Sequence, residues 1–151
     1  MVAQFDDAWF EEWKQRMRDS GGNVILALGL RPIEESAERV VMEMPYGPNV
    51  RQGTGVFAAG AIIQLADVAA TMACFKAMEE MYKPGQAPFP VSIQISSNLI
   101  RNADNGTLRT ETKLVHKGRT TMVAESKITD EGGRLIALVT STHFVAQRSG
   151  G

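Results

Sequence analysis

Residues 52–78 constrain the fold of this 151-residue chain more than any other stretch. A glycine-rich entry leads into a run, residues 57–75, in which Asp67 is the only charged residue. An apolar run of this length, rich in alanine, isoleucine, leucine and methionine, predicts one helix that is buried on almost all sides. We place this central helix at residues 57–81.

The few polar residues of the predicted helix fall on one side of it. Gln64, Asp67 and Thr71 follow one another at intervals of three and four residues. At about 100° per residue they form a narrow stripe, with Gly60 at its upper end. A buried carboxylate without a partner is costly. Asp67 is therefore either exposed or satisfied by a neighbouring strand, or it is a desolvated carboxylate that serves as a base or a nucleophile.

The composition excludes several classes of protein. An apolar content of 44% with 22% charged residues is typical of one soluble globular domain, which we place at residues 1–151. The formal net charge of −1 gives no general attraction to nucleic acid or to an anionic membrane. Cys74 is the single cysteine, so it forms no internal disulfide. We interpret it as a small core side chain in a cytoplasmic protein.

Neither a membrane span nor a metal site is expected. Apart from the central helix no uncharged run reaches transmembrane length, and that helix carries the polar stripe. Two histidines and one cysteine, without a cluster of acidic residues, do not make a metal site. We interpret His116 and His143 as structural residues, because no acid and nucleophile accompany either of them in the sequence.

The rest of the chain predicts one further helix and a set of strands. Residues 5–20 place Phe5, Trp9 and Trp13 at four-residue intervals, which indicates an amphipathic helix that packs on its own domain. The tail, residues 146–151, we expect to fray. The predicted fold is α+β, with a curved antiparallel sheet around the central helix. Alternating apolar residues and turn signals predict strands at residues 24–33, 39–44, 91–101, 107–116, 120–129 and 134–146.

The N-terminal turn of the central helix has the composition of an oxyanion hole. Its first N–H groups have no partner within the helix, and the small side chains of Ala59 and Gly60 let a ligand carbonyl approach them. Asp67 lies eight residues later, about 12 Å along the axis at 1.5 Å per residue, which is beyond the reach of an aspartate. If both features serve one reaction, they come from two copies of the chain. The sequence therefore predicts a two-fold homodimer with two shared sites.

Several local sequences match a known family. The central helix is entered through Ala-Ala-Gly at residues 58–60 and continues as Leu-Ala-Asp-Val-Ala at residues 65–69. Two hairpin sequences follow, at residues 114–119 and 130–135. In these features the chain resembles the hot-dog-fold thioesterases, specifically their phenylacetate-degradation-type branch. The resemblance implies hydrolysis of an acyl-CoA thioester by a homodimer or a dimer of dimers, with CoA as part of the substrate and with no other cofactor.

The resemblance also implies roles for individual residues. Asp67 takes the place of the family's acid, which is either the nucleophile or the general base for water. The N–H of Ala59, beside Gly60, polarises the thioester carbonyl. Gln52, fifteen residues before the acid, helps to hold that carbonyl. Asn49 is the alternative residue for this amide role.

Further matches lie close to the acid. Thr71 follows it by one helical turn, and Ser92 takes the place of a serine that steadies the water in some relatives. Gln64 shares the stripe of the acid and is a candidate for substrate binding. The family histidine before the oxyanion glycine is Ala58 here, and losing a donor of this kind costs roughly 100-fold in rate. A non-hydrolytic acyl-CoA-binding protein of the same fold is therefore the alternative to a thioesterase.

Basic residues at two turns are candidates for contacts with the phosphates of the coenzyme. Arg101 stands at the end of a predicted strand, and Lys117, Gly118 and Arg119 form a predicted hairpin turn. Cations and turn N–H groups are the usual partners of phosphate oxygens. The alternative is that these are ordinary solvated turn residues.

Overall fold

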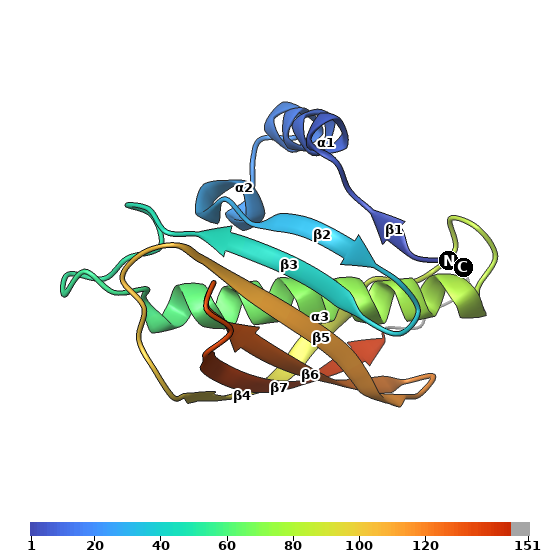
Figure 1. Ribbon diagram of the computed structural model, residues 1–151. Helices are drawn as coiled ribbons and strands as arrows, with labels where there is room; N and C mark the ends of the chain where they lie inside the picture. The colour runs from blue at the N-terminus through green and yellow to red at the C-terminus, as the bar shows by residue number, and fades with distance from the viewer. Residues whose placement is uncertain (146–151) are drawn as a thin grey trace.

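The structure, a computed structural model, describes residues 1–145, which form three helices and seven strands (Figure 1). The expected fraying of residues 146–151 lies outside the described residues. The helices are α1 (Asp7–Asp19), α2 (Val24–Leu28) and α3 (Ala59–Met81). The strands are β1 (Ala3–Gln4), β2 (Arg31–Glu35), β3 (Val40–Pro45), β4 (Pro90–Leu99), β5 (Thr107–Lys117), β6 (Thr121–Thr129) and β7 (Leu135–Val145).

One antiparallel sheet curves around α3, as Figure 1 shows. Its strands follow the order β1-β2-β3-β5-β6-β7-β4. The main core lies between the helix and the sheet, where Leu65 and Ala69 of α3 belong to one cluster with Met44 and Ile128 of the strands. The predicted α+β architecture, a long central helix wrapped by an antiparallel sheet with an additional N-terminal helix, is confirmed.

The central helix is apolar because the sheet covers most of it. Leu65, Cys74 and Met78 are fully buried, and burial raises the pKa of the Cys74 thiol to about 12, so Cys74 is a core side chain. α3 has the length and the hydropathy of a membrane span, but most of that apolar window is buried within this domain. A core helix that is surrounded by a sheet has the same composition.

The segment after the first helix differs from the prediction. A strand over residues 24–33 was expected, but the chain forms the short helix α2 and begins the strand β2 only at Arg31. The side chain of Asn23 accepts a hydrogen bond from the N–H of Leu26 at 3.1 Å, and Gly29 ends the helix with φ of 67°. An N-cap and a left-handed C-cap thus override the strand preference of the valine and isoleucine between them.

The predicted N-terminal helix is confirmed as α1. Asp6 accepts a hydrogen bond from the N–H of Trp9 at 2.8 Å, which caps the helix. The rings of Trp9 and Trp13 stack with centroids 5.6 Å apart. Arg31 of β2 lies over the ring of Phe10, 5.0 Å from its centroid. Of these contacts, the one between Arg31 and Phe10 links α1 to the sheet, whereas the stack of Trp9 on Trp13 lies within the helix.

Strand β4 forms one edge of the sheet and leaves apolar side chains uncovered. It pairs with β7 and with no other strand among residues 1–145. Val91, Ile93 and Ile95 of β4 are 46%, 60% and 40% exposed, and Phe89 just before the strand is 65% exposed. An apolar edge strand of this kind is a surface on which a second chain can pair.

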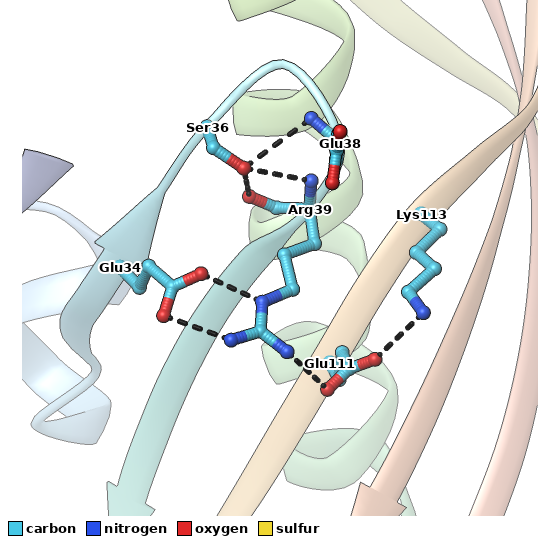
Figure 2. A network of polar contacts seen from close by, with 6 residues as sticks. All are labelled: Glu34, Ser36, Glu38, Arg39, Glu111 and Lys113. Carbon is cyan, nitrogen blue, oxygen red and sulfur yellow. Dashed lines mark hydrogen bonds and ion pairs between the residues drawn. The ribbon is translucent and has the colours of Figure 1, made fainter. Parts of the chain in front are cut away.

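A network of charged residues links β2 and β5 through Arg39, which precedes β3, on the face of the sheet opposite α3 (Figure 2). Arg39 donates to both carboxylate oxygens of Glu34, at 2.6 and 3.1 Å, and to Glu111 at 3.2 Å. Lys113 lies 3.0 Å from Glu111. The hydrogen bond from Arg39 lowers the pKa of Glu34, and that from Lys113 lowers the pKa of Glu111. We call these four residues the Arg39 network.

Candidate active site

Asp67 stands at one end of a chain of polar contacts that runs from α3 to the strands β4 and β7. It is half-buried at the middle of α3, and the hydroxyl of Ser92 on β4 donates a hydrogen bond to its Oδ1. Ser92 Oγ lies 3.4 Å from Nδ1 of His143 on β7, and the His143 Nε2 lies 2.9 Å from Oγ of Ser141. We call these four residues the Asp67 network.

The pairing of β4 with β7 brings this network together. Ser92 and His143 are directly opposite in the register of the two strands, so their side chains project from the same face. A bulge follows at once, because the register shifts between Ser92 and Gln94. Bulges re-aim the neighbouring side chains and are common beside active sites. Ser141 lies two residues before His143 and shares its face.

The environment of His143 favours the neutral form of its imidazole. The residue is completely buried, and burial lowers the pKa of its imidazole below the ordinary value of 6.5. The negative charge of Asp67 acts in the opposite direction but is the smaller effect. A neutral imidazole has one N–H donor and one acceptor nitrogen, so it can pass hydrogen bonds in one direction only.

A cavity of about 560 Å³ opens beside the acid, between α2, α3 and β4. Asp67, Thr71 and Ser92 supply polar groups to its wall, and Glu35 lines it as well. Burial raises the pKa of Glu35. Thus the structure brings together three of the residues that the sequence predicts for the site, Asp67, Thr71 and Ser92.

The rest of the cavity wall is largely apolar. Val24 and Ile25 come from α2, Met72 and Phe75 from α3, and Phe89 from the segment before β4. The rings of Phe75 and Phe89 lie with their centroids 6.1 Å apart. A mainly apolar wall with a few polar groups at one place is the usual make-up of a small-molecule site. A second cavity, of about 390 Å³, lies at the turns 102–106 and 130–134, away from Asp67.

The N-terminal turn of α3 is uncapped and open. Ala58 is the N-cap residue with an extended backbone, and it offers no side-chain hydrogen bond to the helix. A Cβ added at Gly60 would meet nothing within 4 Å, so a ligand has room there. The N–H groups of this turn are therefore available donors at the positive end of the helix. Ala59 is eight residues from Asp67, about 12 Å along the axis.

Both candidate amide residues lie on the loop that enters α3, and both are exposed. The Gln52 side chain donates to Oγ1 of Thr54 at 2.8 Å, and the Asn49 side chain donates to the Ala27 carbonyl at 3.0 Å. Asn49 thereby ties this loop to α2. Gln52 is held at the same end of the helix as Ala59, because the loop backbone runs antiparallel to itself between Arg51 and Phe57. The structure thus separates an N-terminal group from the group around Asp67.

The candidate phosphate contacts also fall at two ends of the molecule. Arg101 donates to the Leu135 carbonyl at 3.0 Å, and Ala103, two residues later, accepts from the N–H of Phe57 just before α3 at 2.8 Å. Lys117 pairs with Glu80 in the last turn of α3 at 2.8 Å. A Cβ on Gly118 would meet the Thr121 carbonyl oxygen at 2.6 Å, so the hairpin itself requires glycine here.

Among residues 1–145, two further residues that the sequence predicts for the site take no part in the polar contacts around Asp67. Arg119 is exposed in the turn between β5 and β6, and Gln64 is half-buried on α3, about one turn before Asp67. The sequence prediction missed His143 and Ser141, which it treated as structural or left out. Their alternation on β7 was the one signal in the sequence. It was not sufficient, because only the pairing of β7 with β4 places them beside Ser92.

Comparison with known proteins decides the family. A family model described as the thioesterase superfamily matches residues 54–137, more than half of the chain. The chain belongs to the thioesterase superfamily. This superfamily member is therefore a thioester hydrolase. ComA2 of Bacillus subtilis, which is named as an esterase, is 30% identical over 130 residues, covering 86% of this chain and 99% of ComA2.

Other relatives of this thioesterase-superfamily chain carry more specific names. The 1,4-dihydroxy-2-naphthoyl-CoA hydrolase of Listeria monocytogenes is 25% identical over 121 residues, covering 80% of this chain and 94% of that protein. A thioesterase from Haemophilus influenzae superposes with a TM-score of 0.79 at 19% identity, over 98% of this chain and 95% of that one. A hypothetical thioesterase from Streptococcus pneumoniae, solved with coenzyme A, gives 0.73 at 24% identity, over 88% and 99%. These structural likenesses confirm the hot-dog fold.

Proposed function

We propose that this protein hydrolyses an acyl-CoA thioester, with Asp67 activating the attacking water. The observation that supports this most directly is the placement of Asp67, whose Oδ1 is held by Ser92 at the wall of a largely apolar cavity. Ser92 occupies one carboxylate oxygen and leaves Oδ2 for a reactant. The acyl group enters the cavity, where its apolar carbons replace water.

The reaction then needs one base and one electrophilic site. Asp67 takes a proton from water, the water oxygen attacks the thioester carbonyl carbon, and an oxyanion forms. Collapse of this intermediate breaks the carbon–sulfur bond, and the proton on Asp67 passes to the departing sulfur, which releases the thiol of CoA and a free acid. Direct attack by Asp67 is the competing mechanism, and a single turnover in ¹⁸O-labelled water separates the two. Water attack puts the label into the product at once, whereas direct attack, followed by attack of water on the aspartyl carbon of the resulting anhydride, puts it first into Asp67.

The oxyanion is bound, in this proposal, by the N-terminal turn of α3 from a second subunit. The N–H of Ala59 and the amide of Gln52 are the donors, and Gly60 leaves room for the thioester. Within one chain these groups are too far from Asp67, because about 12 Å of helix separates Ala59 from it. The absent histidine at Ala58 leaves the backbone N–H as the principal donor.

The edge strand β4 supports such a dimer. Ser92, which contacts Asp67, belongs to β4, so the acid lies beside the uncovered edge of the sheet. Two β4 strands paired about a two-fold axis would continue the sheet and cover Ile93 and Ile95. The two α3 helices would then run antiparallel, and each Asp67 would approach the N-terminal turn of the other helix. Two such dimers then form the proposed dimer of dimers.

The same dimer would assemble the phosphate contacts. Arg101 lies near the N-terminal end of α3 and the hairpin of Lys117 and Arg119 near its C-terminal end. Antiparallel helices bring these opposite ends of two chains together, so cations from both chains surround one coenzyme. The relatives named for a CoA thioester and solved with coenzyme A support CoA as the thiol. The Leu-Ala-Asp sequence at residues 65–67 supports the phenylacetate-degradation-type branch.

Turnover of a panel of thioesters tests this function. Short-chain, long-chain and aryl acyl-CoAs are offered to the wild-type protein, to Asp67→Asn and to Glu111→Gln, which makes the same chemical change outside the site. Release of free thiol by the wild type and by Glu111→Gln, but not by Asp67→Asn, is the expected result. Binding of CoA without turnover of any thioester would favour the non-hydrolytic acyl-CoA-binding protein. Equal rates for Asp67→Asn and the wild type would remove Asp67 from the mechanism.

A further inference from the structure

His143 is a buried, titratable group that the proposed reaction does not use directly. It lies on β7, completely buried, with its two ring nitrogens facing two serine hydroxyls. Asp67 is the charged group that acts on the ring, and the paired residue on the neighbouring strand β6 is the buried, apolar Met122. The ring therefore lies between two hydroxyls, one of which contacts Asp67. The direction of these hydrogen bonds decides how the ring acts on the acid.

The count of hydrogens fixes this direction. Ser92 has a single hydroxyl hydrogen, and it donates that hydrogen to Oδ1 of Asp67. Towards His143 the Ser92 oxygen can therefore only accept, so the Nδ1 of His143 carries the proton. A neutral ring then has an unprotonated Nε2, which accepts the hydrogen of Ser141 at 2.9 Å. All donors of the Asp67 network thus point towards the carboxylate.

We infer that His143 is a positioning residue for the proposed hydrolysis, which holds the Ser92 hydroxyl in the one orientation that donates to Asp67. This inference rests on the proposed function. Without the Nδ1–H, the hydroxyl of Ser92 is free to rotate about its C–O bond and to bond to water in the cavity. Oδ1 of Asp67 then loses its fixed partner, and the carboxylate loses its fixed orientation.

The geometry shows which contact in the chain is loose. The Ser92–His143 separation of 3.4 Å is long for a hydrogen bond, whereas the Ser141–His143 separation of 2.9 Å is ordinary. Catalytic hydrogen bonds are often long without substrate and shorten in the complex. Ser141 therefore holds the ring in place, whereas the contact with Ser92, which sets the tautomer, is the one that can shorten when the cavity is filled.

A double-mutant cycle separates this role from a purely structural one. The rates of His143→Leu, Ser92→Ala and the double variant are compared with the wild type, with His116→Leu as the control at the other histidine. We expect about a tenfold loss of kcat for His143→Leu, with KM little changed. In the Ser92→Ala background, His143→Leu should cause no further loss, because His143 acts through Ser92. Additive losses would overturn the inference.

Conservative variants and a spectroscopic measurement cover the case in which His143→Leu fails to fold. His143→Asn keeps an N–H donor near the place of Nδ1 and should retain most of kcat, whereas Ser141→Ala should lose part of it. The ¹⁵N spectrum of the imidazole in the wild type, assigned with His116→Leu, should show a protonated Nδ1 and an unprotonated Nε2. The opposite tautomer would overturn the inference even if every thioester assay succeeds. A wild type without any turnover would instead reject the proposed function, and the positioning role with it.

Discussion

The Arg39 network and the Asp67 network are both chains of polar residues that link separate elements of the fold, but they differ in how charge is balanced. In the Arg39 network Glu34 and Glu111 each contact a cation, and the residues lie on the face opposite α3 (Figure 2). The Asp67 network contains one charged residue and three neutral ones, at the wall of a cavity. The first network is complete within the chain, whereas the second leaves a carboxylate oxygen for a reactant.

The same chemical change should therefore have opposite consequences in the two networks. Asp67→Asn removes the base and is expected to lower kcat by roughly 10²–10⁴-fold, the usual contribution of a general base. Glu111→Gln should leave the thioesterase rate within about twofold of the wild type, because exposed ion pairs contribute little. The release of free thiol from an acyl-CoA measures both. A similar loss in the two variants would mean that the comparison is wrong.

The second-largest effect is expected at the N-terminal turn of α3. Ala59→Pro removes one N–H at the first helical position, where proline is well tolerated, and the extended backbone of Ala58 suits a following proline. We expect about a 100-fold loss of kcat, as for other oxyanion donors. Ala59→Gly keeps the N–H and serves as the control. If Ala59→Pro is folded and fully active, this N–H does not bind the oxyanion.

The burial of His143 gives the Asp67 network a pH-dependent stability that the Arg39 network lacks in the same range. Its pKa is below 6.5 in the folded protein, so the unfolded chain binds the proton first as the pH falls. The free energy of unfolding should therefore decrease as the pH falls below about 6.5, and stop decreasing below the folded pKa. Denaturant titrations across this range should show a smaller decrease for His143→Asn. Glu35, whose pKa is raised, changes the free energy of unfolding with the opposite sign as the pH falls. It does so equally in the wild type and in His143→Asn. Identical slopes would contradict a neutral, buried His143.

The smallest effect is expected in the Arg39 network itself. Arg39→Met removes the contacts to Glu34 and Glu111, which lie on a solvated face. We expect a slightly lower melting temperature, a difference that shrinks in high salt, and a thioesterase rate within about twofold of the wild type. Arg39→Lys should lie between the two proteins in melting temperature, since lysine cannot form the two parallel contacts with Glu34. A large loss of activity in Arg39→Met would connect the outer face of the sheet with the site.

Features that depend on neighbouring residues in the chain were predictable from the sequence. The composition of residues 57–75 predicts α3, and the spacing of Asp67 and Thr71 predicts their common side. The alternation after α3 predicts four strands, β4 to β7, close to where they lie. The exception is α2, because single capping residues, Asn23 and Gly29, decide there against a strand-like sequence.

Features that depend on strand register were not predictable. His143 lies 51 residues after Ser92, and only the β4–β7 pairing makes them neighbours. Arg101 follows β4 and Lys117 is the last residue of β5, yet the sheet places them near opposite ends of α3. Residues so far apart along the chain form no local sequence pattern that would predict their contact. The family resemblance predicted Ser92 as a site residue, whereas its contact with His143 became known only from the structure.

The central claim is that each site takes Asp67 from one subunit and the N-terminal turn of α3 from another. Mixing Asp67→Asn with Ala59→Pro under conditions that allow subunit exchange tests it most directly. Random exchange makes half of the dimers mixed, and each mixed dimer has one intact site of two, so about a quarter of the wild-type rate should return. Each variant alone stays nearly inactive. If the mixture is no more active than its components, although mass spectrometry shows mixed dimers, the site lies within one chain and the shared-site account is wrong.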